Sequence, residues 1–374
     1  MRIPWAPAAF VLLLGACSHM EPLPEWVQAP SSRDLEQVLS GELLFDEPPA
    51  DNELPSYELM TLSPMMRVVA EEVALQYRHP DQRAEALHRA LLSSQMAGGQ
   101  GMRYTALNTT TASRAFERRE VNCLSFTLMY VAMARHIGLK AEVNDVRVPP
   151  MWDLRDDESF LLFRHVNAKV MLPRGEELVI DLEMERYSPV YEQKVIGDRL
   201  VAAQFYNNLG MERVATGDRR QGFLHLRRAL VLDDRQSYLW NNLGTLYKRM
   251  GVPGAAEVAY RQGLKLAPDD LSLMSNLANL YEAEGEVDKA AYFLHRVRKH
   301  RNSNPYYLYS LAREQLANGD LAQAERYLEQ AIARQAEEPR FYALAAEIYD
   351  QRALPEKAEI MRRKAKSRRE EVYL

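Results

Sequence analysis

The C-terminal part of the chain repeats itself every 34 residues. Five dipeptides follow one another at this step: Leu209-Gly210, Leu243-Gly244, Leu277-Ala278, Leu311-Ala312 and Ala345-Ala346. A small residue stands twelve positions after each dipeptide, at Gly222, Ala256, Ala290, Ala324 and Ala358. A large apolar residue follows four positions later in the first four copies, at Leu226, Tyr260, Leu294 and Leu328. Small residues let paired helices approach closely, and we expect the large ones to fill the space between neighbouring repeats.

Turn signals separate the two expected helices of each copy. Four copies carry a glycine there, at Gly217, Gly251, Gly285 and Gly319, and the fifth has Ala353. This period and pattern resemble the tetratricopeptide repeat. The resemblance implies an all-α solenoid of about five repeats over residues 201–374, because one repeat alone cannot bury its apolar face. The basic, polar segment 357–371 is expected as the helix that caps the solenoid.

The repeats predict a protein or peptide partner. Asn208, Asn242 and Asn276 occupy one position in three successive copies. By the resemblance this position faces the concave groove of the solenoid, where amides can bind an extended peptide backbone. The alternative is that these amides form hydrogen bonds between helices, and the sequence favours neither interpretation.

The N-terminus has the pattern of a secretory signal: Arg2, an apolar run, and small residues before Cys17. Leu14-Gly15-Ala16-Cys17 resembles the bacterial lipobox. The resemblance implies that 1–17 is a signal segment with its lipobox, that cleavage takes place before Cys17, and that Cys17 is acylated. Ser18 then implies sorting to the outer membrane, with the protein facing the periplasm. Residues 18–56 are rich in proline and acidic side chains and are expected as a tether. A short helix within 33–45 is expected to dock on a later domain.

Residues 57–200 are expected as an α+β domain. Apolar residues in 63–94 recur at helical spacing, with a break near Pro80, and a further helix follows over 123–138. Three β-branched and aromatic runs come next, at 140–148, 159–172 and 177–184. Helices followed by strands indicate an antiparallel sheet with helices packed to one side.

Cys123 stands where the helix of 123–138 begins. A helix N-terminus favours the thiolate, which is the nucleophilic form of cysteine. His165 lies on a strand further downstream, 159–172, and can accept the thiol proton. Asp181, on the strand after that, can orient the imidazole. A nucleophile, a base and a group that orients the base are the elements of covalent acyl transfer. The alternative for Cys123 alone is a small buried core residue.

The order cysteine at a helix start, then histidine and aspartate on successive strands, resembles the transglutaminase-like (papain-like) superfamily over residues 60–200. The resemblance implies Cys123 as nucleophile, His165 as general base and acid, and Asp181 as orienting acid. Family members often carry an aromatic residue just after the cysteine, a Trp soon after the histidine and Pro-Thr after the aspartate. Here those places hold Leu124, the stretch 166–168 and the pair 182–183.

Taken together, these patterns predict an envelope lipoprotein with a thiol acyl-transfer domain that acts on peptide amide bonds, with hydrolysis favoured over cross-linking. The solenoid would recruit the substrate. The alternative is a non-catalytic assembly scaffold that retains the domain as a relic. Two cysteines are too few for a cysteine-cluster metal site, and neither a metal nor an organic cofactor is implied. A net charge of -5 gives no support to nucleic-acid binding.

Overall fold

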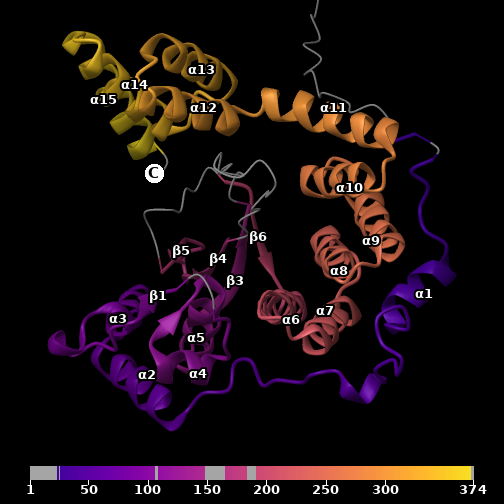
Figure 1. Ribbon diagram of the computed structural model, residues 1–374. Coiled ribbons are helices and arrows are strands. Elements are labelled where there is room, and N and C mark those ends of the chain that lie inside the picture. The colour runs from indigo at the N-terminus through magenta and orange to yellow at the C-terminus, as the bar shows by residue number, and fades with distance from the viewer. Residues whose placement is uncertain (1–22, 25, 106–107, 148–164, 183–190, 372–374) are drawn as a thin grey trace, which may run out of the picture.

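The computed structural model describes residues 23–24, 26–105, 108–147, 165–182 and 191–371. A mixed part of helices and strands comes first, and an array of paired helices follows it (Figure 1). Among the described residues no helix is both long and apolar enough to span a bilayer.

The mixed part begins with helices that form around proline and polar caps. Its elements up to the long central helix are α2 Pro64–Gln76, α3 Pro80–Leu92, β1 Arg103–Tyr104, α4 Ala112–Arg118, β2 Glu120–Val121 and α5 Cys123–His136, with 3-10 turns at Gln95–Ala97 and, earlier, at Asp51–Glu53. Pro64 and Pro80 each stand in the first turn of a helix, where the missing N–H costs nothing. The expected break near Pro80 is therefore the start of α3. Helix α5 is buried along most of its length.

A four-stranded antiparallel sheet follows the helices. It consists of β3 Lys140–Val146, β4 His165–Met171, β5 Glu177–Ile180 and β6 Gln193–Ile196, in the order β5-β4-β3-β6. The chain turns from α5 into β3 at Gly138, whose φ of 80° suits glycine. Helix α5 packs against β3 and β4. The edge strand β6 was not among the expected runs, because its four residues include exposed Lys194 and Val195.

Ten helices form the array of five pairs. They are α6 Asp198–Ala215, α7 Arg219–Leu232, α8 Ser237–Arg249, α9 Pro253–Leu266, α10 Leu271–Ala283, α11 Val287–Ser303, α12 Pro305–Ala317, α13 Leu321–Arg334, α14 Pro339–Gln351 and α15 Pro355–Glu371. Each pair corresponds to one expected repeat, and α15 is the expected terminal helix. The first helix starts a little before residue 201.

Close approach between paired helices explains the small residues of the repeat. A Cβ atom on Gly210 would lie 2.8 Å from Leu226, and one on Gly244 would lie 2.6 Å from Tyr260. Leu226 and Tyr260 thus fill the space over the first helix of their own repeats, within the pairs α6–α7 and α8–α9. The packing of the large residues between neighbouring repeats stays a prediction.

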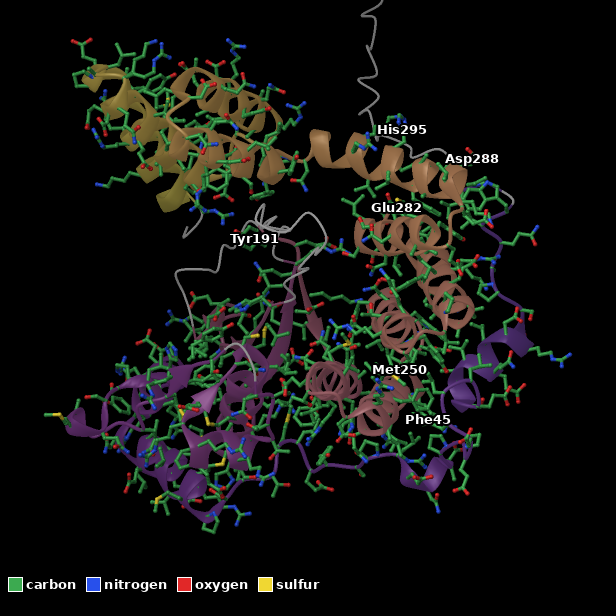
Figure 2. The ribbon with its side chains drawn as sticks, viewed as in Figure 1. Phe45, Tyr191, Met250, Glu282, Asp288 and His295 are labelled. Carbon is green, nitrogen blue, oxygen red and sulfur yellow. The ribbon has the colours of Figure 1, made fainter. Side chains whose placement is uncertain are left out.

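The segment before the mixed part lies along the solenoid. Helix α1 (Ser32–Ser40) packs against α9, on the side of the array away from the sheet (Figure 1). Trp26 packs edge-on against Tyr281, Tyr292 and Phe293, and Tyr247 donates a hydrogen bond of 2.6 Å to the Val38 carbonyl. Figure 2 shows Phe45 beside the array, where its ring meets Phe223 of α7. The expected docking helix therefore forms, while the described part of 18–56 is held by the repeats and is not a free spacer.

The mixed part contacts both ends of the array. At the first repeat, Arg135 of α5 pairs with both carboxylate oxygens of Asp198 at 2.9 and 3.0 Å. At the far end, Tyr191 reaches toward the C-terminal repeats (Figure 2). Its ring lies 6.4 Å from that of Tyr306, and the Arg340 guanidinium lies 5.5 Å from both ring centroids. The mixed part therefore contacts the array at its first repeat and again at α12 and α14.

The turn of the fifth repeat offers a test of backbone strain. Gly217, Gly251, Gly285 and Gly319 have φ between 76° and 82°, and the exposed Ala353 adopts φ 56° at the same place. An alanine pays about 1 kcal/mol in this left-handed region. We expect Ala353→Gly to raise the free energy of unfolding by about 0.5–1 kcal/mol and the matched Gly319→Ala to lower it by about 1 kcal/mol. Urea denaturation followed by circular dichroism measures both, and a loss of stability in Ala353→Gly would contradict the strain.

Candidate thiol site and repeat surface

Cys123 is the first residue of α5 and is half-buried. Asn122 caps the helix: its Oδ1 accepts a 2.8 Å hydrogen bond from the Ser125 N–H, and its Nδ2 donates one of 2.8 Å to the Thr109 hydroxyl. Asn122 is therefore the N-cap of α5. The Asn122 side chain satisfies the N–H group of Ser125. The N–H groups that precede it in the first turn of α5 point out of the helix at the end where the Cys123 thiol lies.

His165 and Asp181 lie together at the end of the sheet. His165 begins β4 and Asp181 directly follows β5, and the two strands are antiparallel neighbours. The imidazole Nε2 and the carboxylate Oδ2 are 2.5 Å apart, with 13% of the His165 side chain and 1% of the Asp181 side chain exposed. The Cys123 thiol lies close enough to the same imidazole to influence its pKa. The structure thus brings the three predicted residues into one constellation.

The charge state of His165 depends on its two partners. Burial by itself lowers the pKa of His165, because it disfavours the charged ring. The hydrogen bond to Asp181, the charge on that carboxylate and the neighbouring Cys123 act in the opposite direction and raise the pKa of His165 to about 10. The imidazole beside the buried carboxylate is therefore protonated at neutral pH.

Two further side chains hold Asp181. His88 of α3 donates from Nε2 to the Asp181 backbone carbonyl at 2.9 Å, and Asn167 of β4 donates from Nδ2 to Oδ2 at 3.1 Å. Burial is the main cause that lowers the pKa of His88, so its ring is a neutral donor. Sequence reasoning did not single out His88, because it lies within an amphipathic helix far from the triad in sequence. Asn167 carries no sequence signal of its own role, because it lies among the ordinary residues of a buried strand.

Such an arrangement can perform thiol chemistry. A thiolate attacks an electrophilic carbon, and the imidazolium beside it can return a proton to the leaving group. The segments 148–164 and 183–190, which precede His165 and follow Asp181, lie outside the described residues, as does Cys17. No group of three or more Cys, His, Asp or Glu in the described part of the chain could hold a metal ion.

The asparagines of the repeats form a ladder between the first helices of successive pairs. Asn242 donates to Asn207 Oδ1 at 2.8 Å, and Asn276 donates to Asn241 Oδ1 at 2.8 Å. Asn208 accepts only a longer bond of 3.5 Å from its neighbour Asn207. For Asn242 and Asn276 the amides thus serve hydrogen bonds between helices, the alternative left open by the sequence. All three predicted asparagines remain partly exposed.

Comparison with known proteins concerns the helical array. Residues 249–314 match one tetratricopeptide-repeat family model, and residues 309–367 match a second. No curated protein sequence matches the chain.

Several solved structures align with nearly half of the chain at low identity. One is PilF of Pseudomonas aeruginosa, with 18% identity, a TM-score of 0.27, and coverage of 46% of this chain and 78% of that chain. Another is MamA, with 19% identity, a TM-score of 0.26, and coverage of 45% and 92%. A third is YrrB, described as a repeat protein with an unusual peptide-binding site, with 16% identity, a TM-score of 0.25, and coverage of 44% and 86%. The C-terminal region of this chain is built of tetratricopeptide repeats, as the family models and its own helix pairs indicate, and such repeats suggest a role in protein–protein interaction or as a scaffold.

Proposed function

We propose that this protein is a scaffold that holds a protein or peptide partner on the inner side of its solenoid, next to the thiol site. The observation that carries the proposal is the stack of repeats itself. Helices α6, α8 and α10 line the side toward the sheet, while α1 and the N-terminal segment cover α7 and α9 on the other side (Figure 1). The inner side therefore remains the surface on which a partner is to be sought.

The binding role predicts a selective loss at Asn208, whose amide takes little part in the ladder. Peptides would be selected from a displayed library on the full chain and measured by fluorescence anisotropy. We expect Asn208→Ala to weaken the selected peptide about fivefold, because one exposed amide hydrogen bond is lost. Asn318→Ala, an exposed asparagine in a turn, serves as the matched control and should change nothing. If the peptide bound Asn208→Ala as tightly as the wild type, the inner side of the solenoid would not be the binding surface.

A second candidate function is thiol acyl transfer on peptide amide bonds, and the contacts among Cys123, His165 and Asp181 favour it. The resemblance of residues 60–200 to transglutaminase-like domains supports the same assignment. The thiolate would attack the amide carbon and form a thioester, while His165 gives its proton to the departing amine as the C–N bond breaks. The backbone N–H groups of Cys123 or Leu124 would stabilise the oxyanion.

The thioester must then be resolved. His165, now neutral, would take a proton from water, whose oxygen attacks the acyl carbon and displaces the thiolate. An amine in place of water would give a cross-link. We favour hydrolysis because water is always present. A relic of this domain, with the repeats alone active, is the competing account.

Alkylation of the thiol separates an active site from a relic. In a Cys17→Ser chain, Cys123 is the sole thiol. Its alkylation should be fast near neutral pH, because the imidazolium stabilises the thiolate, which is the reactive form of cysteine. His165→Ala should slow alkylation near neutral pH about tenfold, because the thiolate loses its imidazolium partner. His136→Ala, which removes a histidine paired with Glu71 at 2.9 Å, is the matched control. A slow wild-type rate that is insensitive to His165 would identify a relic.

The lipid anchor is a proposal from the lipobox-like residues before Cys17. It would hold the protein on the periplasmic side of a bacterial outer membrane. In a bacterial host fed with labelled palmitate, the full chain should incorporate label and Cys17→Ser should not, because the acylated atom is then absent. Label retained in Cys17→Ser would contradict this anchor.

A further inference from the structure

We propose that Asn167 is a positioning residue of the thiol site, which fixes the Asp181 carboxylate against His165. The proposal rests on the thiol function proposed above. Asn167 is fully buried, and its Nδ2 lies 3.1 Å from Asp181 Oδ2, the oxygen that also meets the His165 Nε2 at 2.5 Å. One carboxylate oxygen therefore has two N–H donors, and their directions determine where the carboxylate can lie.

The strand register brings these groups to one face of the sheet. His165 and Asn167 are two residues apart on β4, so their side chains leave the strand on the same side. Ala168 pairs with Ile180 in the antiparallel ladder of β4 and β5, so the next residue, Asp181, stands level with Asn167. Asn144 of β3 is paired directly with Asn167. The network is thus built by three neighbouring strands, which are a rigid base for a site.

Hydrogen bonds further along the sheet fix the orientation of the Asn167 amide. Asn144 donates from Nδ2 to Asn167 Oδ1 at 2.8 Å and to Gln193 Oε1 at 3.1 Å. Because Asn167 Oδ1 is engaged in this way, its Nδ2 must face Asp181. The opposite orientation would place an amide oxygen against a carboxylate. Each amide therefore donates to the next group: Asn144 of β3 donates to Asn167, and Asn167 donates to the Asp181 carboxylate.

The orientation of these amides leaves one buried polar atom without a hydrogen bond, and this costs free energy of folding. Asn144 Oδ1 is buried and makes no hydrogen bond to any described residue. An amide pair that served only to join β3 and β4 could be replaced by apolar side chains without this penalty. The cost is understandable if the amides exist to present a donor to Asp181. His88 adds a separate hold on the backbone of the same residue, at 2.9 Å.

Asn167 also marks a departure of this chain from the transglutaminase-like pattern. It lies in the stretch after the histidine, where members of that superfamily often carry a Trp. An indole N–H and ring cannot reproduce both hydrogen bonds of an amide, since indole has no acceptor oxygen. The Asn167–Asn144 pair is therefore a solution specific to the residues of this sheet.

The test uses the full Cys17→Ser chain and the near-isosteric variant Asn167→Leu, which removes the donor but fills its space. Alkylation of Cys123 is followed against pH, and folding is checked by thermal unfolding. We expect the rate near neutral pH to fall about tenfold and its pH profile to change, because Asp181 no longer orients the imidazole. Gln204→Leu is the matched control. It removes another buried amide that faces a carboxylate, Asp145, at 3.4 Å.

A double variant distinguishes positioning from a general contribution to folding. In an Asp181→Ala background, Asn167→Leu should slow alkylation no further, because the carboxylate that it positions is gone. Equal slowing in both backgrounds, or an unchanged pH profile in Asn167→Leu, would overturn the proposal while the thiol function stands. If the wild-type thiol is itself slow and insensitive to His165→Ala, the proposed thiol function fails and this role fails with it.

Discussion

Helix α6 belongs to both parts of the molecule, and its packing determines where the repeats lie relative to the thiol site. One side pairs with α7, where Leu226 lies directly over Gly210. Other side chains bind the mixed part: Asp198 pairs with Arg135, and Glu212 accepts the backbone N–H groups of Asn108 and Thr109 at 3.2 and 2.9 Å. A glycine at Gly197 separates this helix from β6. The solenoid is therefore joined to the mixed part by packed contacts as well as by the chain itself.

The repeats could be predicted from the sequence because their geometry places the same local requirements on the same positions in each copy. A left-handed turn residue selects glycine, and a close helix approach selects Gly or Ala, whatever the rest of the chain does. The residue types of the thiol site could be predicted for a related reason: few side chains can serve as a nucleophile, as a base or as an acid that orients the base. Their meeting at one end of the sheet follows from the antiparallel order of β4 and β5.

Other features depend on tertiary contacts that carry no local pattern. The docking of the described residues before 57 relies on single side chains, such as Trp26, that pack against aromatic rings far away in sequence. Strand β6 is short and half-exposed, so it lacks the alternation that marks a strand. The roles of His88, Asn144 and Gln193 depend on hydrogen-bond partners up to 93 residues away. A buried amide in a strand looks the same in sequence whether it serves a site or not.

Energetics favours a functional origin for the thiol site over a structural one. Asp181 is 1% exposed, and a buried carboxylate loses more solvation than a single ion pair returns. Well-packed apolar side chains at Asp181 and His165 would satisfy the same space at lower cost, and they would also free Asn167 and Asn144 from the sheet interior. The protein instead gives this carboxylate two N–H donors, from His165 and Asn167, while His88 binds the Asp181 backbone carbonyl. It also places a half-buried thiol at a helix start beside the imidazole. Such an arrangement adds little to the stability of the fold. It does hold the imidazole proton in a fixed place, and a thiolate requires such a proton beside it.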